Sequence, residues 1–269
     1  METVRLKNIV IIILALLNLF LLSLIVSNQV RTSRAAQETR DQIFLLFEKN
    51  NIALDPATAK KDTRADTLLF LRDTAAEQAF AESLLGECTW ADEGGGIYSY
   101  TSPTGIASFH TTGTFDISTV GISVDSPQEF AADICRKFGY EEPTADFTED
   151  GTGTLSASAH LDGHPVLNAS ILFTFTRGKL ISVSGIYLSS CEVVPGGEVS
   201  LSATDALADF VDHTVNNGLI CHELLEMKTA YVLHSTTDGI RLTPVWLLQA
   251  DTFRCYTAGD ENGILQLSA

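Results

Sequence analysis

Residues 126–139 read SPQEFAADICRKFG, and this stretch encodes both ends of a helix. Ser126 and Glu129 form a capping box, and Pro127 stands at the first helical position, where a missing N–H is tolerated. Gly139 follows as a C-terminal stop. The apolar side chains between these ends recur at four-residue steps: Phe130, Ile134 and Phe138. We therefore predict an amphipathic helix that packs its apolar side against a sheet.

The chain after this helix predicts three antiparallel strands. Residues 155–161, LSASAHL, alternate apolar with polar or small side chains, which is typical of a half-buried strand. An Asp-Gly turn at 162–163 leads into a strand over 166–176, and an Arg-Gly turn at 177–178 leads into a strand over 180–188. The unit is thus one helix followed by three strands.

The same formula occurs before and after this unit. Thr74 and Glu77 form a capping box at the start of a predicted helix over 74–85, and Ser202 begins a predicted helix over 202–217. The strands predicted around these two helices are 67–71, 88–91, 96–101, 106–111 and 114–120, and then 222–234, 240–250, 253–257 and 264–267. Such alternation predicts an α+β fold in which each antiparallel sheet is covered on one face by a helix.

This pattern divides the chain into four parts. They are residues 1–30, a cytoplasmic tip and transmembrane anchor; residues 31–120, a neck helix and an N-terminal α+β subdomain; and residues 121–195 and 196–269, two α-β-β-β modules. The last two parts resemble duplicates of one another. We expect the neck helix within 29–50, an acidic loop over 141–151 and a PGGE linker over 195–198.

A long apolar run precedes the neck. Residues 9–26, within NIVIIILALLNLFLLSLIVS, contain no charged side chain. A helix of this length, at about 1.5 Å per residue, crosses a hydrocarbon core of roughly 30 Å with help from its flanks. The run is longer than the apolar part of a signal peptide and has no convincing cleavage site, so we predict an uncleaved anchor. The residues of this predicted anchor include Ile9, Leu14, Asn18, Leu22 and Val26.

Charge gives a modest argument for the side of the membrane on which residues 41–269 lie. Basic residues stand on both sides of the run, with Arg5 and Lys7 before it and Arg31, Arg34 and Arg40 after it. The positive-inside rule therefore does not decide. Residues 41–269 carry 12 Lys and Arg against 32 Asp and Glu, and such acidity is repelled by nucleic acid and by an anionic cytoplasmic leaflet. We predict a single-pass protein of the cell membrane with a cytoplasmic N-terminus and an extracytoplasmic C-terminal domain.

The five cysteines have no metal or redox spacing. Cys88, Cys135, Cys191, Cys221 and Cys255 are far apart and odd in number. This pattern differs from Cys-x-x-Cys motifs and from dense disulfide frameworks. We expect free or buried thiols, and a chance disulfide pair stays open.

One segment near the C-terminus resembles a known family. Residues 242–246 read LTPVW, and an aromatic strand with a turn follows over 253–263. Together with the uncleaved anchor, the polar neck and the helix-plus-meander units, this Pro-x-Trp strand resembles the YycH/YycI family of membrane-anchored regulatory proteins. Peptidase-propeptide-type (PepSY) modules end similarly.

The resemblance implies a function without catalysis. Members of that family regulate a membrane-bound sensor histidine kinase of a cell-envelope two-component system, through the transmembrane helix and the outer domain. The implied partners are the kinase, a sister regulator and the lipid bilayer. Asn18 and Ser23 are the candidate contacts in the membrane, since an amide in hydrocarbon is best satisfied by another helix. Pro244 and Trp246 are candidates for a peptide groove, with a core position for Trp246 as the alternative. The alternative function is a PepSY-like binding or inhibitor module acting on a peptidase or peptide.

The sequence contains no recognisable catalytic or cofactor motif. His222 and Glu226 lack the second histidine of a zincin helix, and they fall on a predicted strand. His160 and His164 flank a hairpin turn, where solvated turn residues or a weak metal site are both conceivable. Gly94–Gly96 lacks the strand-to-helix context of a phosphate loop and predicts a flexible turn. We therefore expect no enzyme, no cofactor and no metal.

Overall fold

The protein is α+β, with helices packed on a large mixed sheet. The computed structural model describes residues 37–148, 150–236, 239–258 and 264–267, together with Phe20 and Leu22. Of the predicted anchor residues, Leu22 belongs to this described part. The others, Ile9, Leu14, Asn18, Ser23 and Val26, lie outside it. Within it, no helix combines the length and apolar character needed to cross a bilayer.

The helices agree closely with the sequence prediction. They are the helix over residues 37–49, α2 (Thr74–Leu85), α3 (Pro127–Phe138) and α4 (Ala203–Asn216). Ser126 and Ser202 cap α3 and α4 by accepting the backbone N–H three residues on. The cap predicted at Thr74 is wrong by one residue, because Asp73 accepts the N–H groups of Ala75 and Ala76.

Each of the three short helices precedes a four-stranded meander. The strands after α2 are β3 (Thr89–Gly94), β4 (Ile97–Ser102), β5 (Gly105–Phe109) and β6 (Thr114–Ser123). Those after α3 are β7 (Thr144–Phe147), β8 (Gly153–Leu161), β9 (His164–Thr176) and β10 (Lys179–Ile186). Those after α4 are β12 (Glu223–Thr236), β13 (Gly239–Ala250), β14 (Arg254–Thr257) and β15 (Ile264–Leu267). The remaining strands are β1 (Ala53–Leu54), β2 (Thr63–Phe70) and β11 (Cys191–Leu201).

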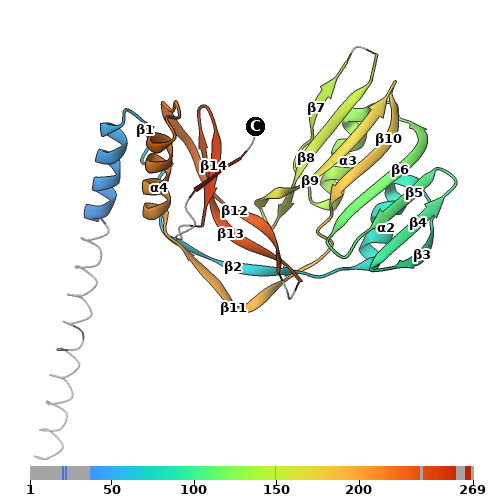
Figure 1. Ribbon diagram of the computed structural model, residues 1–269, viewed down its shortest axis with the longest axis horizontal. Coiled ribbons are helices and arrows are strands. Elements are labelled where there is room, and N and C mark those ends of the chain that lie inside the picture. The colour runs from blue at the N-terminus through green and yellow to red at the C-terminus, as the bar shows by residue number, and fades with distance from the viewer. Residues whose placement is uncertain are drawn as a thin grey trace, which may run out of the picture.

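The first two meanders form one lobe around a shared core. Antiparallel pairing of β6 with β10 joins them in the order β3-β4-β5-β6-β10-β9-β8-β7. Phe80 on α2 lies 4.6 Å from Phe138 on α3 and 5.0 Å from Phe115 on β6, measured between ring centroids. Both helices therefore pack on the same face of this sheet, and we call this part the α2–α3 lobe (Figure 1).

The third meander forms a second lobe with its own core. Phe210 on α4 stacks on Phe47 of the helix over 37–49 and on Phe253, at centroid distances of 5.9 and 5.7 Å. We call this part the α4 lobe. The long strands β2, β11 and β13 run between the two lobes (Figure 1). A parallel bridge between Tyr231 and Val166 also connects β12 with β9, so the sheet is mixed rather than purely antiparallel.

Two predicted loops are wrong because they contain edge strands. The PGGE segment over 195–198 lies within β11, where the register shifts between Val193 and Glu198. Pro195 is tolerated there since β11 pairs only with β2 among the described strands, and a bulge at an edge needs no proline N–H. The acidic segment over 141–151 contains β7, whose exposed Asp146 suits a sheet edge.

Candidate functional site

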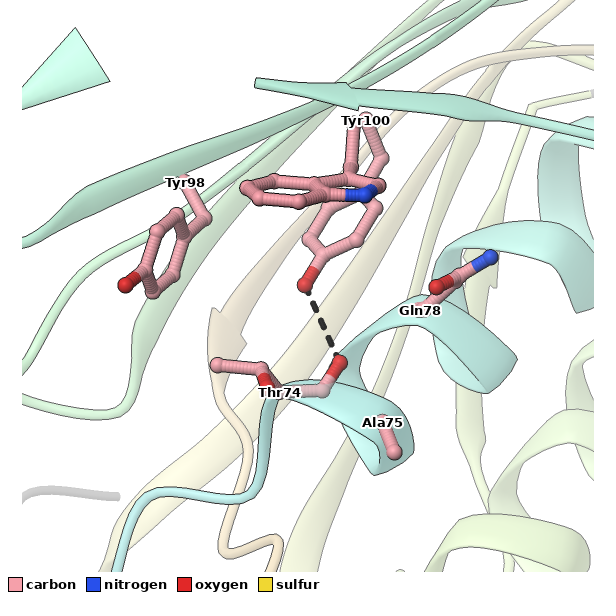
Figure 2. Close-up of a pocket in the computed structure, with 6 residues that line it drawn as sticks. Thr74, Ala75, Gln78, Tyr98 and Tyr100 are labelled. Atoms are coloured by element: carbon pink, nitrogen blue, oxygen red, sulfur yellow. Dashed lines mark hydrogen bonds between the residues drawn. The ribbon is translucent and has the colours of Figure 1, made fainter. Parts of the chain in front are cut away.

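A small aromatic pocket opens at one end of the α2–α3 lobe. Its volume is about 310 Å³, and it lies between the first turns of α2 and the strands β3 and β4 (Figure 2). Its lining comprises Thr74, Ala75, Gln78, Trp90, Tyr98 and Tyr100. Its polar groups are hydroxyls, one side-chain amide and one indole N–H, all of which can form hydrogen bonds with a ligand.

Strand alternation brings the three aromatic rings to one face. Trp90 on β3 is the register partner of Tyr100 on β4, and Tyr98 lies two residues earlier on the same strand. Residues two apart on a strand share a face. The Trp90 side chain meets the Tyr98 ring edge to face at 6.1 Å and stays 63% exposed. An exposed tryptophan on an ordered aromatic base offers a binding surface.

Arg72 fixes the geometry behind the pocket. Its guanidinium makes a two-point ion pair with the buried Glu77 of α2, at 2.8 and 2.9 Å. It also donates to the carbonyl oxygens of Gly96 at 2.6 Å and Phe109 at 3.1 Å. The same group lies 4.3 Å from the centroid of the Tyr98 ring. One side chain thus ties the start of α2 to the β3–β4 turn and to the end of β5.

Tyr100 attaches the aromatic base to the helix. Its hydroxyl donates to the carbonyl oxygen of Thr74 at 3.1 Å, as Figure 2 shows. Burial, with a smaller contribution from the Glu77 charge, raises the pKa of Tyr100 to about 12. The phenol therefore stays protonated and keeps its hydrogen bond at neutral pH. Gln78 directs its amide to Glu82 at 2.8 Å.

The pocket adjoins the free edge of the sheet. Among the described strands, β3 pairs only with β4, and all six of its residues are exposed. An edge strand presents unpaired backbone groups to which an extended peptide can add. Asp92 lies on the pocket face two residues from Trp90, which gives this edge an aromatic group and a negative charge side by side. The edge therefore favours an extended segment with an apolar and a basic side chain.

The residues proposed from the Pro-x-Trp strand lie inside the protein. Trp246 is 3% exposed in the core of the α4 lobe, and Pro244 is also buried. The Nε1 of Trp246 has no hydrogen-bond acceptor among the described residues. In this structure Trp246 therefore occupies the core position that the sequence offered as the alternative to a groove.

The histidines singled out by the sequence do not line the aromatic pocket. His160 on β8 and His164 on β9 flank the turn between these strands, and Nδ1 of His164 lies 2.7 Å from the hydroxyl of Thr229. His222 precedes β12, and its Nδ1 lies 2.8 Å from a carboxylate oxygen of Asp251. Across the described residues, no group of three or more potential ligands has a geometry suited to a metal ion.

Sequence reasoning did not find the pocket. The spacing of Tyr98 and Tyr100 was a usable signal, because aromatic residues two apart on a strand share a face. Their relation to Trp90 depends on the β3–β4 register, and the link to α2 depends on Arg72. Glu77 was interpreted as part of a capping box, although it pairs with Arg72.

Comparisons with known proteins add no identification. A scan against protein-family models gave no match, and searches of curated proteins and of solved structures gave none either. The resemblance to membrane-anchored regulators therefore rests on the sequence features alone.

Proposed function

We propose that this chain is a non-enzymatic, membrane-anchored regulator that binds a partner through its extracytoplasmic domain. The partner class is a sensor histidine kinase of the cell envelope, engaged through the outer domain and the transmembrane run. The proposal unites two features, which are the uncharged run over 9–26 and the aromatic pocket of the α2–α3 lobe.

The observation that carries the binding role is the exposed Trp90 beside the free edge of β3. Large exposed aromatic groups on a rigid base are typical anchors of protein interfaces. Arg72 supplies that rigidity, since it orders the β3–β4 turn and Tyr98 together. The lining offers stacking surface and hydrogen bonds but no acid–base pair, which favours recognition over catalysis.

The position of the pocket suits contact with a partner's outer domain. Figure 1 places α2, β3 and β4 at the opposite end of the molecule from the helix over 37–49, where the chain enters from the apolar run. A partner segment bound at the pocket would therefore be separated from the helix over 37–49 by the rest of the described domain.

Co-purification from native membranes tests this proposal. The tagged full chain and its Trp90→Ala variant are compared, and histidine kinases and peptidases in each eluate are quantified by mass spectrometry. We expect a histidine kinase with the parent chain and about tenfold less with the variant, corresponding to roughly 1–2 kcal/mol. Equal kinase recovery with both chains, or no kinase with either, would contradict the proposal.

A second function is favoured by the sheet edge itself. Strand addition at β3 is a general way of holding an extended peptide, so a module that acts on a peptidase or a peptide is the alternative. Recovery of a peptidase in place of a kinase in the same experiment would favour this alternative.

A further inference from the structure

A second cavity lies at the opposite end of the molecule, where the chain leaves the apolar run. This groove of about 730 Å³ is formed by the helix over 37–49, the segment over 56–62 and the first turns of α4. The helix over 37–49 and α4 lie side by side at that end (Figure 1). Six of the lining residues decide its chemistry: Arg40, Phe44, Pro56, Lys60, Lys61 and Leu207.

The groove contains two lysines that form no salt bridge within the described chain. Lys60 and Lys61 are exposed, and neither forms an ion pair with any carboxylate of the described chain. Two acids also line the groove. Both are exposed, and Asp62 accepts the N–H of Ala203 at the start of α4 at 2.8 Å, so the lining carries three cationic side chains against two carboxylates. Two ammonium groups therefore remain available to an anion.

Arg40 holds the segment that presents these lysines. Its guanidinium donates to the carbonyl oxygens of Pro56 at 3.0 Å and Ala59 at 3.2 Å. It also lies 5.8 Å from the centroid of the Phe44 ring. The segment before Lys60 is thus tied to the helix, and the groove combines a cationic rim with an apolar floor.

The part of the chain that supplies most of this groove is far less acidic than the rest. Residues 67–269 carry 8 Lys and Arg against 27 Asp and Glu, whereas residues 31–66 carry 7 against 6. Gln37, which lines the groove, comes only eleven positions after Val26, the end of the apolar run. Those intervening residues span at most about 40 Å when fully extended. A groove that follows a membrane-spanning run so closely lies within reach of the bilayer surface.

We propose that this groove binds the phosphate of an anionic phospholipid headgroup. Lys60 and Lys61 contact the phosphate, Arg40 holds their segment in place, and Phe44 and Leu207 lie against the glycerol region. The contact would orient the acidic remainder of the domain away from the membrane surface. The inference depends on the membrane position of residues 9–26, but it does not depend on a kinase partner.

Lysine acetylation of the full chain in lipid nanodiscs tests the proposal. The chain is placed in discs of phosphatidylcholine alone or of phosphatidylcholine with phosphatidylglycerol, and the modification rate of each lysine is measured by mass spectrometry. We expect Lys60 and Lys61 to react about fivefold more slowly in the phosphatidylglycerol discs. Lys179, which is exposed in the α2–α3 lobe, is the internal control and should react equally in both.

Two variants and a soluble anion show whether the groove binds a lipid headgroup or free phosphate. The Arg40→Gln variant should lose the protection of both lysines, whereas Lys179→Gln should retain it. Equal reactivity of Lys60 in the two kinds of disc would overturn the inference. Protection by inorganic phosphate in phosphatidylcholine discs would overturn it too, because the ligand would then be a soluble anion. Failure of the chain to insert into any disc would instead count against the membrane anchor itself.

Discussion

Arg72 and Glu77 form a two-point ion pair in which the carboxylate is almost fully buried. The pair joins the end of β2 to α2, and its side chains are only 15% and 2% exposed. Because the remaining guanidinium N–H groups reach the backbone of the β3–β4 turn and of β5, the aromatic pocket depends on this contact.

Removing Arg72 should destabilise the protein strongly. The Arg72→Met variant leaves the Glu77 carboxylate buried without its partner, which costs about 3–5 kcal/mol. Urea-induced unfolding of the full chain in detergent, followed by circular dichroism, measures this free energy. The control is Arg64→Met, which breaks an exposed pair with Glu198 and should cost less than about 1 kcal/mol.

A double variant tests whether the cost comes from the unpaired charge. Arg72→Met combined with Glu77→Met should be more stable than Arg72→Met alone, because no carboxylate then stays buried unpaired. If the single and double variants are equally unstable, the contacts of Arg72 with the Gly96 and Phe109 carbonyls dominate instead.

The two tryptophans should respond in opposite ways to substitution. Trp90→Ala removes a side chain that is 63% exposed, so stability should change by less than about 1 kcal/mol while partner binding falls. Trp246→Ala opens a cavity in the α4 lobe and should cost about 3–5 kcal/mol. Urea unfolding and co-purification of both variants check this. A large loss of stability in Trp90→Ala would mean that its effect on binding reflects folding.

The helices were predictable because their signals are local. Ser126 and Gly139 lie within one short segment, and both ends of α3 fall where these residues place them. The pairing of β6 with β10 was not predictable, since it joins strands separated by a whole helix and three further strands. The strand β11 was missed because Pro195 usually marks a loop, whereas a bulge at a sheet edge accommodates it. The pocket was missed for the same kind of reason, because Trp90 acquires its role only from the register with Tyr100 and from Arg72.

The five thiols should react slowly in the native protein. Burial is the main cause that raises the pKa of all five thiols, to about 11 for Cys135, Cys191 and Cys221 and to about 12 for Cys255. At pH 8 these groups are therefore almost entirely protonated, and the thiolate is the reactive form. Iodoacetamide labelling followed by mass spectrometry should modify all five cysteines in denaturant but few of them in the native state. Rapid native labelling of Cys255 would contradict this.

Asp251 should contribute to the acid sensitivity of the fold. Hydrogen bonds from the side chain and backbone of His222 lower the pKa of Asp251 below its usual 3.8. A carboxylate with a lowered folded-state pKa stabilises the protein above the unfolded-state pKa and loses this contribution as pH falls through the folded-state pKa. The stability difference between the parent and Asp251→Asn should therefore be constant near neutral pH and shrink below about pH 4. A difference that is independent of pH would show that charge plays no part.

The last prediction separates the anchor from the domain. Asn18 is the only amide within residues 9–26, and an amide in hydrocarbon is satisfied best by a partner helix. Asn18→Leu keeps insertion favourable and removes up to roughly 1–2 kcal/mol of hydrogen bonding between helices. We expect unchanged protein level and unchanged urea unfolding, with several-fold weaker co-purification of the kinase. Exchanging the whole of residues 9–26 for an unrelated anchor should have a larger effect in the same direction.

The exchanged anchor can also be combined with Trp90→Ala, which acts only on the outer domain. The combination should give an additive loss of kinase recovery if both surfaces contact the kinase independently. Normal kinase regulation by the chain with the exchanged anchor would assign all recognition of the kinase to the outer domain and would contradict a role for Asn18.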